Sequence, residues 1–165
     1  MEEPWLRGIR PDLPPVTGHL LRASEHIRED LARALAPLTP GQLWATPYEM
    51  TSAGFHAKHL AGSTGRLCTY LEGRTLTKEE LAAIPLEGVG AESAAELIDS
   101  VNRAFERYER LVRELAPGHF GDVREIGRRR LATTAIGLAI HIVEHGQRHA
   151  GQAITAARLA RATHG

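Results

Sequence analysis

Four long segments of this chain place an apolar residue at every third or fourth position, the spacing of an α-helix with one buried face. Prolines and glycines separate the segments: Pro37 and Pro40 end the first, Gly73 follows the second, and Pro117 ends the third. Proline cannot donate the hydrogen bond that a continuing helix needs, and glycine favours the position just after a helix end. The sequence therefore predicts helices over residues 16–36, 53–71, 91–115 and 131–162.

The alternating pattern of a half-buried strand does not compete with these helices. We therefore expect an all-α chain, a four-helix bundle with long connections between helices 1 and 2, 2 and 3, and 3 and 4. The first connection, 37–54, contains apolar and aromatic residues and should lie against the bundle. The second, 74–90, and the third, 118–130, are expected to be loops, the second with a helical turn in "TKEELAAI". The length of 165 residues predicts one domain, residues 1–165.

Composition excludes several classes of function. Lys plus Arg and Asp plus Glu number 20 each, so the chain lacks the basic excess typical of nucleic-acid binding. The single cysteine, Cys68, rules out an internal disulfide and is expected to be a small core residue. No apolar run approaches the roughly 20 residues of a membrane helix, and "MEEPWLRGIRPDLPP" lacks the apolar centre of a signal peptide. We expect a soluble, cytoplasmic protein that binds neither nucleic acid nor membrane.

The segment "HIVEHGQRHAGQA" contains His141, His145 and His149 at spacings of four. Heptad steps from Leu131 place His145 and His149 on the apolar seam of this helix, with His141 beside it. Two neighbouring buried imidazoles are unfavourable unless their nitrogens find partners, and protonating both would bring like charges together. A divalent metal ion removes both problems, because neutral imidazoles one turn apart can bind the same ion. Hydrogen-bonded core histidines without a metal are the alternative.

A third ligand must come from another helix, because two side chains rarely hold a metal ion. His56 and His59 both lie beside the apolar stripe of the second helix, and periodicity does not choose between them. His19 and His26 in helix one are weaker candidates. His119 in a loop and His164 in the C-terminal tail are expected not to be ligands.

Two stretches, "FHAKHLAGSTGRLCTYLEG" and "HIVEHGQRHAGQA", resemble the DinB-like (YfiT-like) superfamily of bacterial proteins. The resemblance implies a four-helix bundle, often a homodimer, in which one histidine of helix two and two of helix four hold a metal ion. By motif, the ligands would be His59, which begins "HLAGS", together with His145 and His149.

The same resemblance gives neighbouring residues supporting roles. His56 and His141 would support the ligands or line a pocket, and Glu144 or Gln152 could anchor the second ring nitrogen of a ligand. No residue is identifiable as a general base, so His56, His141 and Glu144 are only candidates.

Three histidines leave a coordination position open, which is typical of catalytic metal sites, where the ion can lower the pKa of a bound water or thiol. Characterised relatives include transferases that use bacillithiol or mycothiol. The resemblance therefore implies a metal-dependent transferase that acts on a small-molecule substrate with a low-molecular-weight thiol. Zinc or nickel is the favoured metal, with iron or manganese as alternatives. Two other functions stay open: metal-dependent hydrolysis, and metal binding without turnover in a stress response.

Overall fold

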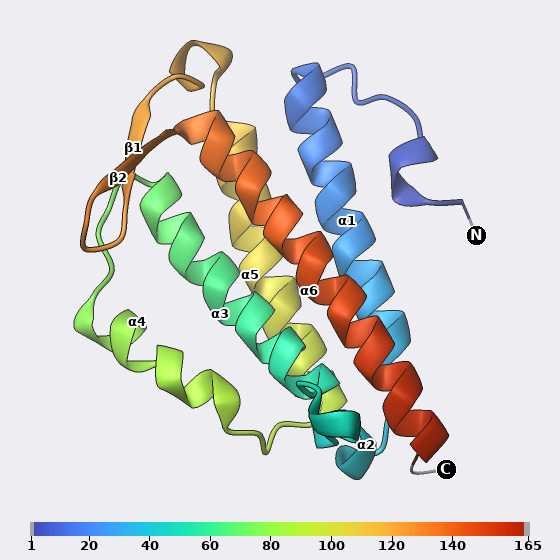
Figure 1. Cartoon of the computed structure of the whole chain (residues 1–165). Helices are drawn as coiled ribbons and strands as arrows, with labels where there is room; N and C mark the ends of the chain where they lie inside the picture. The colour runs from blue at the N-terminus through green and yellow to red at the C-terminus, as the bar shows by residue number, and fades with distance from the viewer. Residues whose placement is uncertain (1, 164–165) are drawn as a thin grey trace.

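A computed structural model describes residues 2–163 (Figure 1). Four long helices lie side by side: α1 (Pro15–Leu35), α3 (Ala53–Leu71), α5 (Ala94–Glu114) and α6 (Ala135–Thr163). Both α1 and α3 pack against α5 and α6. The described chain is mostly helical, as the sequence predicts. In this part of the chain, no helix combines the length and apolar character that crossing a membrane would require.

The core lies between the four long helices and is built from the apolar stripe of each. Large, fully buried side chains come from all of them: Ile27, Leu60, Phe105, Tyr108 and Ile142. The Tyr108 hydroxyl donates a hydrogen bond of 3.0 Å to the carbonyl oxygen of Ala139 in α6, so its polar end is satisfied inside the core. This bond ties α5 to the part of α6 that directly precedes the histidines. Cys68 is also fully buried, as expected.

The first connection lies against the long helices, as predicted. It contains α2 (Pro40–Trp44), capped by the side chain of Thr39, and the 3₁₀ turn η2 (Pro47–Glu49). Leu43 of α2 is fully buried, and α2 contacts both α3 and α6.

The second connection contains the helical turn expected in "TKEELAAI". This turn is α4 (Lys78–Ala82), capped by the side chain of Thr77, and the 3₁₀ turn η3 (Ile84–Gly88) follows it and contacts α3. Two further 3₁₀ turns are η1 (Pro4–Leu6) and η4 (Pro117–His119).

The third connection is where the sequence prediction is wrong, because it forms an antiparallel hairpin instead of a loop. Its strands are β1 (Val123–Ile126) and β2 (Leu131–Thr134). Gly127 and Arg130 in the turn adopt positive φ angles of 69° and 50°, which allow the chain to reverse. Strands of four residues with mostly exposed side chains give too weak an alternation to be recognised in the sequence.

The hairpin also moves the start of the last helix from the expected residue 131 to Ala135. The Thr134 hydroxyl accepts a hydrogen bond of 3.1 Å from the backbone N–H of Gly137. This is the contact of a helix N-cap, and it ends the strand where the helix begins.

The buried face of α6 differs from the heptad seam. Gly146 and Ala150 are buried, His145 and His149 are partly exposed, and Gln152 is exposed. A straight α-helix repeats every 3.6 residues, so a seam of 3.5 residues drifts by about 20° per heptad. The two histidines therefore stand at the edge of the buried face, not within it.

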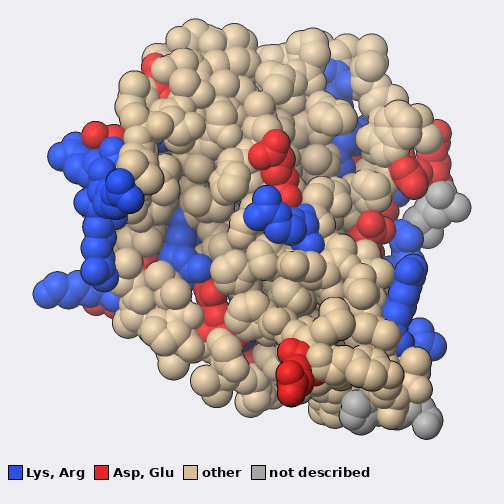
Figure 2. All heavy atoms as spheres, viewed as in Figure 1, with Lys and Arg blue, Asp and Glu red and all other residues tan. Residues whose placement is uncertain are grey.

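Figure 2 shows one face of the molecule, on which acidic and basic side chains are interspersed among neutral ones. This distribution agrees with the balanced charge of the sequence.

Candidate metal centre

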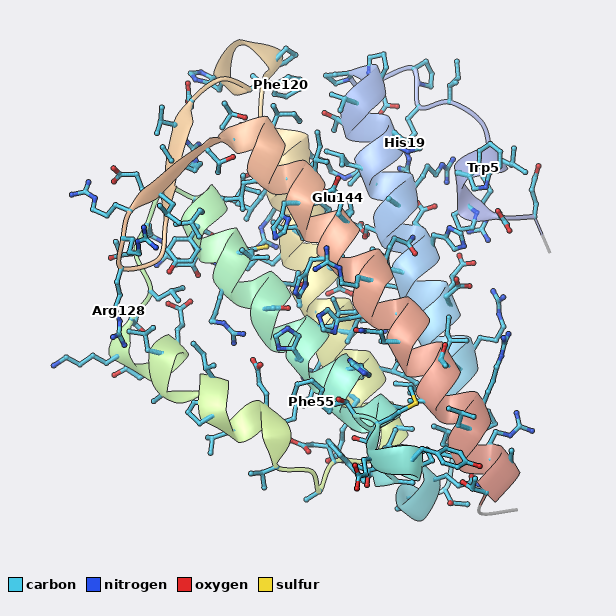
Figure 3. The ribbon with its side chains drawn as sticks, in the orientation of Figure 1. Trp5, His19, Phe55, Phe120, Arg128 and Glu144 are labelled. Carbon is cyan, nitrogen blue, oxygen red and sulfur yellow. The ribbon has the colours of Figure 1, made fainter. Side chains whose placement is uncertain are left out.

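Three histidines from two helices come together between α3 and α6. One ring nitrogen each of His59, His145 and His149 lies within 4.8 Å of the other two. The ring centroid of His149 is 4.5 Å from those of both His59 and His145, which are 5.3 Å from each other. Figure 3 labels Phe55 and Glu144, which mark this region on α3 and α6. The structure thus brings together the three residues that the sequence analysis proposes as ligands.

Local helix geometry explains this arrangement. His145 and His149 are one turn apart on α6, so their side chains project from the same face. The Ser52 side chain caps the start of α3 by accepting a hydrogen bond from the backbone N–H of Phe55, which puts His59 in the second turn. The Phe55 ring stacks on the His59 ring, with a centroid distance of 5.6 Å and an interplanar angle of 10°. Phe55 therefore covers one face of His59.

Two of the rings are held by oxygen atoms at their Nδ1 atoms. Glu87 Oε2 lies 2.7 Å from His59 Nδ1. Ser63 Oγ lies 3.5 Å from His145 Nδ1, and the Ser63 hydroxyl donates to the Leu60 carbonyl, so the Ser63 oxygen can accept from the imidazole. Both contacts are satisfied when Nδ1 carries the proton, which leaves a lone pair on Nε2 of each ring.

The third ring follows the same pattern through a fourth histidine. His149 Nδ1 lies 3.1 Å from His56 Nδ1, so one of these nitrogens donates and the other accepts. When His149 Nδ1 is the donor, its Nε2 also keeps a lone pair. With that assignment, the three Nδ1 contacts are compatible with three Nε2 lone pairs for one shared ion.

Burial favours the neutral form of the two α6 imidazoles. Burial, and then the charge of neighbouring histidines, lowers the pKa of His145 and of His149 to about 4. Burial also lowers the pKa of His56. The neutral ring is the form that binds a metal ion, so His145 and His149 need no deprotonation at neutral pH. Three imidazoles at this spacing fit a divalent transition metal.

The other residues expected to assist the ligands lie at the edge of the site. Glu144 is exposed, and its carboxylate is 3.9 Å from the imidazole of His141, which is also exposed. The His141 ring centroid is 6.0 Å from that of His145. Gln152 is exposed as well. The Nδ1 atoms of the candidate ligands contact the residues described above instead of Glu144 or Gln152.

The remaining histidines lie elsewhere. His19 is on α1 (Figure 3). His26, also on α1, is 3.3 Å from an aspartate of the same helix. His119 is 3.1 Å from an aspartate in the loop after η4. His164 lies outside the described residues.

Glu87 was not predicted as part of the site, because residues 74–90 were expected to be a loop without a role in it. Glu87 is 6% exposed, and its second oxygen, Oε1, accepts a hydrogen bond of 2.5 Å from Arg66 Nη1. Buried glutamates are rare unless they are paired, but the sequence does not reveal burial within a short turn. Ser63 was not predicted either, although it lies four residues after His59 on the same face of α3, and that spacing could have identified it.

A cleft of about 630 Å³ opens beside His56, between α6 and the segment that precedes α3. Its lining includes Arg148 and Gln152 of α6 and residues 49–51. Among the described residues, Arg148 has no hydrogen-bond or ion-pair partner. The cleft is large enough for a small molecule and offers it a positive charge.

The fold and the site define the class of protein: a helical chain with a three-histidine cluster, suited to a metal ion, between two of its long helices. A comparison with protein families agrees with this description: the sequence model of the DinB superfamily matches residues 23–153. The chain therefore belongs to the DinB superfamily. A comparison with curated proteins finds no match.

Proposed function

We propose that His59, His145 and His149 bind one divalent transition metal ion. The observation that carries this proposal is the convergence of one nitrogen from each ring within 4.8 Å. Membership of the DinB superfamily supports it, and so do the Nδ1 contacts, which are compatible with a lone pair on Nε2 of each ring. We also infer that the four long helices are the bundle expected from the family resemblance.

The donor set favours zinc or nickel, with iron or manganese as alternatives, because imidazole nitrogen suits all of these ions. Three protein ligands leave at least one coordination position for a substrate, which is the arrangement of catalytic sites.

We further propose that the protein is a transferase that uses a low-molecular-weight thiol of the bacillithiol or mycothiol type. A bound divalent ion would supply positive charge that favours the anionic form of a sulfur or oxygen group. Phe55 shields one face of His59 from water. The unpaired guanidinium of Arg148 would bind an anionic group of the small molecule in the cleft beside His56.

Elemental analysis of protein purified without a histidine tag tests the site. We expect about one equivalent of a transition metal per chain, and a loss of this metal in His59→Ala. Absence of metal after reconstitution with zinc, nickel, manganese or iron would refute the proposed site. Turnover that requires an added thiol would support the transferase, whereas turnover without a thiol would support hydrolysis. Bound metal without either activity would indicate a protein that binds metal without turnover.

A further inference from the structure

A buried carboxylate from outside the long helices contacts one of the candidate ligands. Glu87 belongs to η3, and its oxygens lie 2.7 Å from His59 Nδ1 and 2.5 Å from Arg66 Nη1. Both oxygens of the carboxylate therefore have a partner with an N–H group, and the guanidinium of Arg66 compensates the charge of the buried carboxylate.

The backbone of α3 makes room for this carboxylate at Gly62. A Cβ atom at this position would overlap Glu87 Oε1 and would lie 2.9 Å from Arg66 Nη1. Glycine is a poor residue for a helix interior, where it costs about 1 kcal/mol relative to alanine. Its presence here is explained by the carboxylate that approaches the helix at this point.

The segment that carries Glu87 is fixed to α3 by contacts independent of the histidines. Lys58 Nζ donates a hydrogen bond of 2.6 Å to the Val89 carbonyl oxygen and is 2.7 Å from the Glu92 carboxylate. Trp44 Nε1 donates a hydrogen bond of 2.9 Å to the Glu92 carbonyl oxygen. These contacts hold the backbone that directly follows η3, so the Glu87 side chain reaches His59 from an anchored segment.

We propose that Glu87 is a positioning residue that sets the tautomer and the orientation of His59. Its carboxylate accepts a hydrogen bond from the N–H of His59 Nδ1, so Nε2 is the nitrogen left for the cluster with His145 and His149. A carboxylate at the second nitrogen of a histidine also makes the ring a stronger metal ligand. The expected effect on metal binding rests on the proposed metal site. The expected effect on the His59 tautomer does not require a metal ion.

Metal affinity gives the first test. Competition with a chromophoric chelator would measure the zinc affinity of the wild type, Glu87→Gln, Glu87→Ala and Gly62→Ala. We expect Glu87→Ala to weaken zinc binding about 10–100-fold, the usual effect of removing such a partner. Glu87→Gln should lose less, because its amide oxygen can still accept from Nδ1. Gly62→Ala should weaken binding as well, because it displaces the carboxylate without removing it.

Glu92→Gln is the matched control. Glu92 contacts Lys58, which lies on α3 next to His59, and the Glu92 carboxylate itself touches no described histidine. We expect its zinc affinity to equal that of the wild type. An equal loss in Glu92→Gln and Glu87→Gln would overturn the proposal, because the effect would then come from loosening the connection.

A second measurement works in the metal-free protein. Long-range ¹H–¹⁵N correlation spectra of histidine-labelled protein distinguish a ring protonated at Nδ1 from one protonated at Nε2. We expect His59 to be protonated at Nδ1 in the wild type and to become a mixture of both tautomers in Glu87→Ala. An unchanged tautomer in Glu87→Ala would overturn the proposal. If the tautomer shifts in Glu87→Ala but the wild-type protein binds no metal, the metal site alone is refuted.

Discussion

Gly146 lies on the buried face of α6, where this helix crosses α1 and α5. A Cβ atom at this position would lie 2.7 Å from Ile27 Cδ1 and 3.2 Å from Phe105 Cζ. The Ile27 contact involves the end of a side chain that can rotate, but the Phe105 ring is fully buried and has little room to move. Gly146→Ala should therefore overpack the core beside the histidines.

The size of the effect follows from two opposing contributions. Alanine is favoured over glycine in a helix interior by about 1 kcal/mol, whereas overpacking a core costs about 1–3 kcal/mol. We expect Gly146→Ala to lower the free energy of unfolding by about 1 kcal/mol. Gly151→Ala, on the same helix, is the matched control, because a Cβ atom there meets no atom within 4 Å. This control should raise the free energy of unfolding by about 1 kcal/mol.

Urea denaturation and thermal melting of the metal-free proteins, followed by circular dichroism, would measure the difference. A gap of about 2 kcal/mol corresponds to about 4–8 °C in Tm for a chain of this size. If both variants were stabilised to the same extent, the close packing of α6 against α1 and α5 at Gly146 would be wrong.

His149→Ala should weaken zinc binding about 100- to 1,000-fold, since four-ligand zinc sites bind with about 10–16 kcal/mol and each ligand contributes roughly a quarter. His141→Ala should leave the zinc affinity nearly unchanged. If chelator competition gave the same zinc affinity for both variants, the ligand assignment would be wrong. Burial raises the pKa of the Cys68 thiol to about 12, so a thiol reagent at pH 8 should label this residue only after denaturation. Rapid labelling of the native protein would contradict its burial. In the metal-free protein, the pKa of His145 and His149 is lowered from 6.5 to about 4, so the unfolded chain takes up these protons first. The free energy of unfolding should therefore fall as the pH drops from 6.5 to about 4, and denaturation of a variant with both histidines replaced by glutamine should show a smaller pH dependence.

The four long helices could be predicted because each one carries an apolar stripe, and the first three end at proline or glycine. The hairpin could not be predicted, because its strands are short and their side chains mostly exposed. Their sequences therefore lack the alternation of apolar and polar residues that identifies a half-buried strand. The buried face of α6 was displaced for a different reason. Heptad steps from Leu131 assume 3.5 residues per turn, so they drift away from the buried face of a straight helix. The core is instead filled by Gly146 and Ala150, with His145 and His149 at its edge.

The site could be predicted in part. The spacing of four identified His145 and His149, but only the family resemblance chose His59 over His56. Periodicity could not separate these two because both lie beside the apolar stripe, and the structure shows both near His149. Of these two, only His59 brings a ring nitrogen within 4.8 Å of both His145 and His149, a property of side-chain placement that no sequence pattern encodes.

The anchors of the three rings show what determines the geometry of the site. Ser63 and His56, which hold the two α6 histidines, both belong to α3. One helix therefore supplies a candidate ligand and also contacts the two candidate ligands of its neighbour. A slip of α6 along α3 by one residue would break both contacts and separate the three nitrogens. The packing that fixes α6 in place, including the close approach at Gly146, therefore also fixes the site. A metal ion that binds only this arrangement must in turn stabilise the folded chain.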